Sequence, residues 1–325
     1  MAHPSNTLSL VADIGGTNTR VALANGGEVL ENTIRRYSNE DYPGLESVLR
    51  KYIAEEGDVD PIATCVAVAG PVHDGKATMT NLDWTIDKDT LLRATNAEHV
   101  AILNDLQAQG HAIGHIKADK LREILPGQSG NEHAAKLVIG VGTGFNAAPV
   151  FDTEAGRLVP PSESGHVNLP VRDERDLRLC HFIETAHGFP SVEDVLSGRG
   201  LTRLYAFLGQ EAGDFREKSG KDIMASVAAK DDPRSVEAAK LFTRFLGAVA
   251  GNLALTQLPF GGVYIIGGVA QAFAPYLSEF GFGDAFRDKG RFAGFMGNFA
   301  VSVVEDDYAA LTGCAAHLVA LRSSH

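Results

Sequence analysis

One pattern occurs twice in this chain: two short runs of strand-forming residues flank a polar turn that is rich in glycine. In the first copy the runs cover residues 8–12 and 20–24, and the turn between them reads DIGGTNT. In the second copy the runs cover residues 136–139 and 147–151, around the turn GVGTGFN. Each copy predicts a β-hairpin whose turn is of a size to surround a phosphate group. Because one chain contains both hairpins, the pattern predicts a duplicated domain.

Other segments indicate alternating strands and helices. Nearly continuous apolar runs of strand-forming residues cover 64–69, 100–103, 262–266 and 300–304, so these strands are expected to be covered on both faces. Apolar residues recur at helical spacing between residues 42 and 53, and residues 235–258 are apolar on most faces, as in a long buried helix. The chain is therefore predicted to have an α/β fold.

Length and charge limit the classes of protein that come into question. A chain of 325 residues is long enough for two compact domains. We predict a small α/β domain of residues 1–112, joined by the C-terminal segment 306–325, and a large α/β domain of residues 113–305. The formal net charge of −12, without a basic stripe, argues against binding to nucleic acid through phosphate neutralisation.

Targeting segments and cysteine chemistry are not indicated either. No run of about 18 apolar residues occurs, and the N-terminus lacks the layout of a signal peptide, so we expect a cytoplasmic protein without a membrane partner. The three cysteines Cys65, Cys180 and Cys314 are odd in number and lack metal-type spacing. They are predicted to be small buried side chains and not parts of a disulfide framework or a zinc site.

The first glycine-rich turn contains groups that could hold a phosphate. Backbone N–H groups around Gly15, Gly16 and Thr17 can face phosphate oxygens, and Asp13 can hold a magnesium ion through water. An ordinary glycine hairpin is the alternative interpretation.

Two later glycine loops raise the same question. Gly142 and Thr143 lie in the second hairpin turn, and Gly267 and Gly268 directly follow the predicted strand 262–266. A glycine pair at the end of a strand lets a flat adenine or ribose lie against the backbone, although a tight strand-to-helix turn would use the same residues.

Asn104 and Asp105 end the predicted strand 100–103, where polar side chains can meet a ligand at the sheet edge. The pair is also common in plain turns. Phosphoryl transfer to an alcohol needs a carboxylate that orients the hydroxyl and takes its proton, and Asp105 is the candidate for this base.

Two further polar segments could bind one polyhydroxylated ligand. Glu163 and His166 lie in a loop that follows two prolines, for which a solvated surface loop is the alternative. Glu193 lies in the sequence SVED before the apolar residues Val195 and Leu196, where it could instead complement a helix dipole in a capping sequence.

Six motifs, in this order and spacing, closely resemble those of the bacterial glucokinases of the hexokinase-like group. They are DIGGTN from Asp13, Asn104-Asp105, Gly142-Thr143-Gly144, ESGH from Glu163, EDVLSG from Glu193, and GGVYIIGG from Gly261. The likeness spans about residues 8–318 and includes Met79-Thr80-Asn81 followed by Trp84.

This resemblance implies an actin-like ATPase fold of the ribonuclease H type, with two domains around a central cleft, and a homodimer. It implies an ATP-dependent hexose kinase, a glucokinase that acts on D-glucose and ATP, with Mg²⁺ bridging the phosphates. In that family pattern Asp105 is the base, and the sugar hydroxyls are bound by Asn81, Asn104, Glu163, His166 and Glu193. The nucleotide is held by Ala12, Asp13, Ile14, Gly15, Gly16, Thr17, Gly142 and Thr143, and Gly267 and Gly268 lie near the adenosine.

The chain departs from the family pattern at three places. The family usually has glycine where this chain has Asn146, Ser162 and Ser164, and a C-terminal DNPG motif appears here as Asp307-Tyr308-Ala309-Ala310. Asparagine tolerates a left-handed backbone well, so Asn146 is expected to replace a glycine without distortion.

Two alternatives to a glucokinase remain at this stage. A kinase for another hexose or amino sugar would differ from it by one or two hydrogen bonds. A sugar-sensing binding protein with weak turnover is the alternative outside the enzymes, and the presence of Asp105 argues against it.

Overall fold

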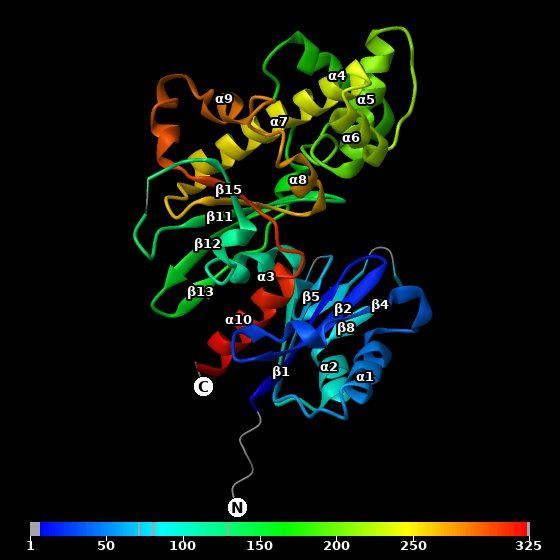
Figure 1. Ribbon diagram of the computed structural model, residues 1–325, viewed down its shortest axis with the longest axis vertical. Helices are drawn as coiled ribbons and strands as arrows, with labels where there is room; N and C mark the ends of the chain where they lie inside the picture. The colour runs from blue at the N-terminus through cyan, green and yellow to red at the C-terminus, as the bar shows by residue number, and fades with distance from the viewer. Residues whose placement is uncertain (1–6, 71, 80–81, 129, 324–325) are drawn as a thin grey trace, which may run out of the picture. The chain divides into compact units, whose positions relative to one another are not determined.

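The two glycine-turn hairpins belong to two different β-sheets in the computed structural model of the protein, which describes residues 7–70, 72–79, 82–128 and 130–323 (Figure 1). In the first hairpin β1 (Leu8–Ile14) runs antiparallel to β2 (Asn18–Asn25). In the second hairpin β11 (Lys136–Val141) runs antiparallel to β12 (Phe145–Thr153). Both predicted hairpins are confirmed, and their strands extend closer to the turns than the apolar runs indicated.

The first sheet has the order β3-β2-β1-β5-β9, with β4 also paired to β2. Parallel pairing of β1 with β5 and of β5 with β9 places Ile14, Val68 and Asn104 in one row across the sheet. The strands beside the hairpin are β3 (Glu28–Val29), β4 (Arg35–Ser38), β5 (Ala63–Val68) and β9 (His99–Asn104). A separate small sheet contains β6 (Val72–His73), β7 (Lys76–Thr78) and β8 (Thr85–Asp87).

The second sheet repeats this plan. Its order β13-β12-β11-β14-β15 again has an antiparallel hairpin followed by two parallel strands, and β10 is added antiparallel at the edge next to β15. The added strands are β10 (Leu121–Leu125), β13 (Gly156–Leu158), β14 (Val263–Ile266) and β15 (Val301–Val304). The repeated strand order confirms the predicted duplication at the level of topology.

Helices cover both faces of the first sheet. Side chains of α1 (Leu45–Glu55) and α2 (Lys88–Thr95) share one apolar core with the sheet residues Leu10, Ile14 and Val66. Side chains of α3 (Asp105–Ala112) and α10 (Ala309–Ser323) share another core with Val11, Cys65 and Leu103. Since successive strand residues point to opposite faces, the strands are apolar on both sides, as the sequence predicted.

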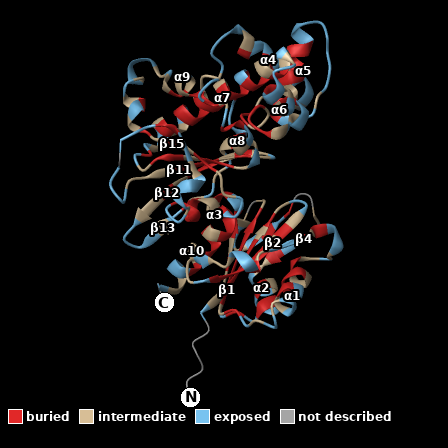
Figure 2. Ribbon diagram, viewed as in Figure 1, coloured by how far each residue is buried: buried red, intermediate tan, exposed pale blue. Residues whose placement is uncertain are grey.

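The second sheet packs against a larger helical core. The predicted long helix is α7 (Pro233–Gln257), and its buried side chains share a core with the sheet residues Ile139, Ile265 and Val303. The other helices are α4 (Glu174–His187), α5 (Gly198–Glu211), α6 (Gly220–Ala229), α8 (Gly268–Phe273) and α9 (Phe282–Arg287). Buried residues, red in Figure 2, follow the strands of both sheets and the inner side of α7.

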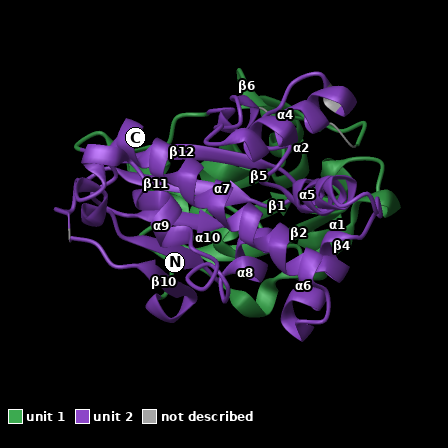
Figure 3. Ribbon diagram, turned by 90° about the horizontal axis from the view of Figure 1, so that it is seen from above, with its two compact units in different colours: residues 1–117, 154–161, 306–325 green, residues 118–153, 162–305 purple. Residues whose placement is uncertain are grey.

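The chain divides into two compact units, which Figure 3 shows in different colours. Unit 1 contains residues 1–117, 154–161 and 306–325, and unit 2 contains residues 118–153 and 162–305. The predicted border lies at residue 112 and the predicted return of the chain at residue 306. The segment 154–161, predicted as part of the large domain, groups with unit 1 instead.

Helix α10 approaches α3 very closely. A Cβ atom on Gly313 of α10 would lie 1.7 Å from the carbonyl oxygen of Ala108 in α3, so only glycine fits at this crossing. Cys65, Cys180 and Cys314 are buried, as predicted. Among the described residues, no helix is long and apolar enough to cross a membrane.

Candidate active site

The first hairpin turn is held in place by a buried asparagine. The side chain of Asn39 donates from Nδ2 to the Gly15 carbonyl at 2.8 Å and accepts at Oδ1 from the Thr19 hydroxyl at 2.8 Å. Its backbone N–H donates to the Thr17 carbonyl at 2.9 Å. Asn39 is only 1% exposed, so its polar groups are satisfied by the turn and the adjoining strand. The motifs gave no indication of this residue, which lies in a short 3₁₀ turn after β4.

Asp13 lies at the end of β1 beside Arg20 on β2. Its Oδ2 atom is 3.3 Å from Nη1 of Arg20, and 21% of its side chain is exposed. Burial raises the pKa of Asp13, and the neighbouring guanidinium opposes that rise. A partly buried carboxylate oxygen next to a phosphate-sized turn is the type of ligand that Mg²⁺ prefers. Among the described residues no group of three or more His, Cys, Asp or Glu side chains could hold a metal.

Asn104 and Asp105 form the start of α3. The Asn104 Oδ1 accepts from the Gln107 N–H at 2.6 Å, and the Gln107 Oε1 accepts from the Asn104 N–H at 3.1 Å, which is a complete capping box. Asp105 is the first residue of the helix, is exposed, and its Oδ1 accepts from the Leu106 N–H at 2.8 Å. Gln107 also donates to the Val159 carbonyl at 3.0 Å. The cap therefore fixes the backbone that carries the Asp105 carboxylate.

The second hairpin turn is fixed by a carboxylate. Oε2 of Glu193 accepts from the Phe145 N–H at 3.0 Å, directly after Gly144. Within the turn the Gly142 N–H donates to the Gly144 carbonyl at 2.9 Å, and the Gly142 carbonyl accepts from the Gly198 N–H at 2.9 Å. Thr143 at the tip is exposed. Glu193 thus lies against the Gly142–Gly144 turn and does not extend freely into solvent.

The capping bonds near Glu193 are made by Asp194 and Ser197 and not by Glu193. Asp194 accepts from the Ser191 N–H at 3.1 Å and from the Ser191 hydroxyl at 2.6 Å, and its own N–H donates back to that hydroxyl at 3.2 Å. Helix α5 begins later and has Ser197 as its N-cap, which accepts from the Gly200 N–H at 3.0 Å. The interpretation that Glu193 complements a helix dipole is therefore wrong, because α5 has no acidic residue in its first turn and the carboxylate that returns to Ser191 is that of Asp194.

Glu163 and His166 lie in a short turn beside the same carboxylate. Ser164–His166 forms a 3₁₀ turn, in which the His166 N–H donates to the Glu163 carbonyl at 3.1 Å. The Gly165 carbonyl accepts from the Glu193 N–H at 2.9 Å. Both predicted side chains, Glu163 and His166, are exposed at this turn.

Asn146 replaces the glycine of the family pattern without adopting a left-handed backbone. Asn146 lies in β12 opposite Gly140, and it is not among the residues with positive φ. Its side chain bonds to the loop of Ser162 and Ser164. The three residues that replace glycines of the family pattern, Asn146, Ser162 and Ser164, therefore contact one another.

Gly267 joins the end of β14 to α8, and its backbone has φ +113°, which strongly favours glycine. A Cβ atom there would lie 2.5 Å from the Val141 carbonyl oxygen, just before the Gly142 turn. At Gly268 no atom lies within 4 Å of such a Cβ. The third glycine loop therefore adjoins the second hairpin turn.

Each unit therefore gathers its own set of predicted residues. Unit 1 places Ala12, Asp13, Ile14, Gly15, Gly16 and Thr17 at the same sheet edge as Asn104 and Asp105, because Ile14 and Asn104 share one row of the parallel strands. Unit 2 places Gly142, Thr143, Glu163, His166, Glu193, Gly267 and Gly268 around one turn. Asn81 lies outside the described residues.

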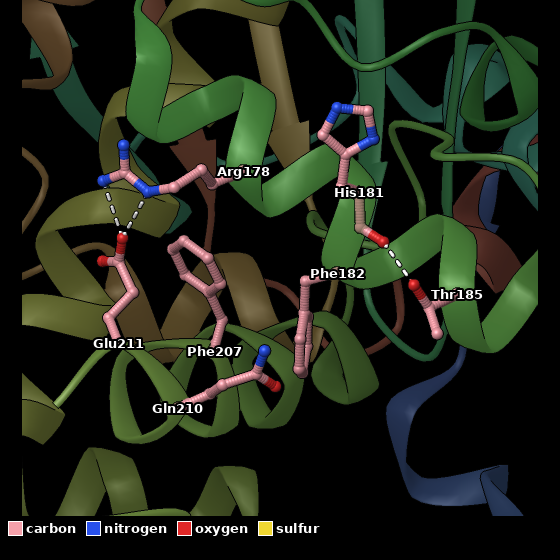
Figure 4. Close-up of a pocket in the computed structure, with 7 residues that line it drawn as sticks. All are labelled: Arg178, His181, Phe182, Thr185, Phe207, Gln210 and Glu211. Atoms are coloured by element: carbon pink, nitrogen blue, oxygen red, sulfur yellow. Dashed lines mark hydrogen bonds and ion pairs between the residues drawn. The ribbon is translucent and has the colours of Figure 1, made fainter. Parts of the chain in front are cut away.

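A surface pocket of about 520 Å³ lies elsewhere in unit 2, between α4 and α5 (Figure 4). Its polar groups largely satisfy one another: Arg178 pairs with Glu211 at 2.7 Å, and the Thr185 hydroxyl donates to the His181 carbonyl at 2.8 Å. Phe182 and Phe207 provide much of its apolar wall. None of the predicted site residues lines this pocket, so it has no part in the candidate site.

The fold identifies a class of protein. A ROK family glucokinase from Streptomyces griseus, solved in complex with glucose and AMPPNP, is similar to this chain with a TM-score of 0.61. The two are 22% identical, and the likeness covers 96% of this chain and 98% of the other. At this identity the comparison shows the fold alone, an α/β fold.

Nearer relatives identify the family. Residues 10–321 match the glucokinase family, and the chain belongs to it. A glucokinase from Saccharophagus degradans is 34% identical over 313 residues, which covers 95% of this chain and 97% of the relative. The crystal structure of a glucokinase from an Antarctic psychrotroph is 29% identical, with a TM-score of 0.86 over 96% of this chain and 98% of that one.

Proposed function

We propose that this member of the glucokinase family transfers the γ-phosphoryl group of ATP to the 6-hydroxyl of D-glucose. One observation supports this reaction above the others: Asp105 is an exposed carboxylate on the first residue of a helix whose start is fixed by a capping box. A carboxylate held in this way can orient the sugar hydroxyl and accept its proton as the new P–O bond forms.

The sugar is held on both sides of this base. Glu163 and His166 accept and donate hydrogen bonds to ring hydroxyls from the turn in unit 2, and Glu193 adds a carboxylate while its Oε2 holds the Phe145 N–H. Asn104 contacts the sugar through its Nδ2 group, because its Oδ1 serves the helix cap. Asn81 completes the set of sugar ligands.

The nucleotide is held by backbone groups and not by a cationic cluster. Ala12–Thr17 surrounds the ATP phosphates, Gly142 and Thr143 contact them from unit 2, and Gly267 and Gly268 lie near the adenosine. Asp13 would hold Mg²⁺ through water, and the ion when bound neutralises charge on the transferring phosphoryl group. With a net charge of −12, the protein depends on this kind of local neutralisation to bind a polyanion.

The two sets of residues act on one substrate pair only if the units enclose a common cleft. Closure around glucose would then exclude water and bring the phosphate loops together, which keeps ATP from being hydrolysed. As part of the same proposal the protein works in the cytoplasm as a homodimer.

The proposal is tested by coupling ATP consumption to a panel of hexoses and amino sugars. Glucose should give the highest kcat/KM, and a different preferred sugar would redefine the substrate. Glu163→Gln should weaken glucose binding about 10–150-fold, because a charged hydrogen bond to a hydroxyl is worth roughly 1.5–3 kcal/mol. Calorimetry should show ATP binding unchanged, and equal losses for both ligands would contradict a sugar-side role for Glu163.

A further inference from the structure

Three polar side chains connect strand β12 to the loop that carries Glu163. The Nδ2 group of Asn146 donates to the Ser162 carbonyl at 2.5 Å. Its Oδ1 lies 2.9 Å from the Ser164 N–H, 3.1 Å from the Ser162 hydroxyl and 3.2 Å from the Ser164 hydroxyl. The same oxygen accepts from the Ala147 N–H at 2.8 Å. We call Asn146, Ser162 and Ser164 the polar clamp.

The amide of Asn146 fits the clamp in one orientation only. Its Oδ1 faces two backbone N–H groups, which can only donate, and its Nδ2 faces a carbonyl, which can only accept. A reversed amide would set donor against donor at Ala147 and Ser164 and acceptor against acceptor at Ser162. The clamp therefore uses both the acceptor and the donor of the asparagine side chain.

The two serine hydroxyls complete the network. The Ser162 and Ser164 oxygens lie 3.1 Å apart, and both hydroxyls can donate to the Ala147 carbonyl. The Ala147 N–H also lies 3.1 Å from the Ser164 hydroxyl oxygen. Two hydroxyl protons thus have several acceptors within reach, so every polar group on this side of the loop has a partner.

The clamp fixes the residue on each side of Glu163. Ser162 is held through its carbonyl and Ser164 through its N–H, while the Glu163 side chain between them remains exposed. The next residue, Gly165, is so close to β12 that a Cβ atom there would lie 2.1 Å from the Phe145 carbonyl oxygen. The backbone from 162 to 165 is therefore anchored to β12 at successive points.

We propose that the polar clamp is a positioning device that holds Glu163 and His166 ready for the sugar before the sugar binds. This inference rests on the proposed function, because it assigns a purpose to the loop only if Glu163 and His166 bind glucose. A loop that is already ordered loses less conformational entropy on binding, so the clamp should strengthen sugar binding without touching the sugar. Nucleotide binding should be insensitive to it.

Asn146→Ala removes all the side-chain bonds of the clamp residue in β12. We expect the KM for glucose to rise at least about tenfold, with the KM for ATP within about threefold of wild type. Asn298→Ala is the matched control, since Asn298 is also half-buried in unit 2 and donates from Nδ2 to the Phe295 carbonyl at 2.7 Å. It should leave both KM values within about twofold of wild type.

A conservative variant distinguishes positioning from general loss of structure. Asn146→Asp keeps the acceptor for the Ala147 and Ser164 N–H groups and loses the donor to the Ser162 carbonyl, so its glucose KM should lie between wild type and Asn146→Ala. If Asn146→Ala does not fold, the double variant Ser162→Ala/Ser164→Ala replaces it. We expect that double variant to raise the glucose KM at least about threefold, with the ATP KM unchanged.

An unchanged glucose KM in a folded clamp variant, or parallel rises in the KM for glucose and for ATP, would overturn the inference. The failure of the proposed function looks different. In that case the wild-type protein would phosphorylate no hexose, or Glu163→Gln would leave glucose binding intact. If Glu163→Gln weakens glucose binding and Asn146→Ala does not, the clamp proposal alone is wrong.

Discussion

The two units use the same hairpin and fix its turn in different ways. In unit 1 the turn after β1 is held by the neutral amide of Asn39, which is buried under it. In unit 2 the turn after β11 is held by the carboxylate of Glu193, which reaches the Phe145 N–H. A repeated strand order thus provides two similar turns, while the residues that shape each turn come from distant and unrelated parts of the chain.

The units differ again where their last parallel strands end. In unit 1 β9 leads into Asn104 and Asp105 at the start of α3. In unit 2 the corresponding strand β15 leads into Glu305, whose Oε1 is 2.6 Å from Nε of Arg122 and whose N–H donates to the Lys120 carbonyl. Both positions carry an acid after the strand, and in unit 2 that acid forms an ion pair with Arg122 of β10. The two units therefore share the strand order, while their last parallel strands lead into different surroundings, a helix in unit 1 and an ion pair in unit 2.

The largest expected effect comes from removing the acid of unit 1. Asp105→Asn keeps the shape and a hydrogen-bonding side chain, but it cannot accept a proton, so kcat should fall roughly 10²–10⁴-fold. Glucose binding, measured by calorimetry, should change little. Glu305→Gln is the matched control in unit 2 and should leave kcat within about twofold of wild type. Near-normal turnover in Asp105→Asn would show that the base is another residue.

The next prediction concerns the residue that follows the middle one of the three parallel strands in each sheet, β5 in unit 1 and β14 in unit 2. Unit 1 has Ala69 after β5, whereas unit 2 has Gly267 after β14, with φ +113° and the Val141 carbonyl too close for a Cβ atom. Gly267→Ala should lower the free energy of unfolding by about 2–4 kcal/mol and weaken ATP binding. Chemical denaturation measures the first quantity. Gly268→Ala should change the free energy of unfolding much less, because its Cβ would enter open space. Equal losses of stability in the two variants would show that the close approach at Gly267 is unimportant.

A smaller effect is expected from the buried asparagine of unit 1. Asn39→Ala leaves the Gly15 carbonyl and the Thr19 hydroxyl without their partner, which should lower the free energy of unfolding by about 1–3 kcal/mol. The KM for ATP should rise more than the KM for glucose, since the turn is on the nucleotide side of the proposed site. Asn32→Ala, at an exposed position of the same unit, is the control. A stable Asn39→Ala protein with normal ATP kinetics would mean that the turn keeps its shape unaided.

The sequence predicted much of the fold because the informative features are local. Apolar runs of strand-forming residues located the two hairpins and the strands after them, and helical spacing located α1 and α7. The duplication was recognisable because glycine turns are short and contiguous. The α/β class and the duplication followed from such contiguous patterns, whereas the family was indicated by the resemblance of six short motifs in their order and spacing.

The supports of the site could not be predicted in the same way. Asn39 and Asn146 each bond to a segment that is more than ten residues away, and a single asparagine in a sequence does not indicate which backbone group it will meet. The tolerance of asparagine for a left-handed backbone is not used at Asn146, because the residue lies in a strand and bonds to the Ser162 loop through its side chain. The dipole interpretation of Glu193 failed because α5 begins at Gly198, further along the chain than the apolar residues Val195 and Leu196 indicated. The roles of the site residues themselves stay predictions until the variants are measured.

The close crossing of α10 over α3 has a consequence for folding during translation. Unit 1 is closed by residues 309–323, which leave the ribosome only after the whole of unit 2. At about 5–20 residues per second, translation of unit 2 takes roughly 10–40 s, and during that time the apolar face that α10 will cover has no partner within its own unit. The nascent chain must keep this face from aggregating, and the helix that begins with Asp105 gains its last support only when Gly313 docks beside Ala108. Unfinished chains therefore lack the helix that packs against α3, which begins with Asp105.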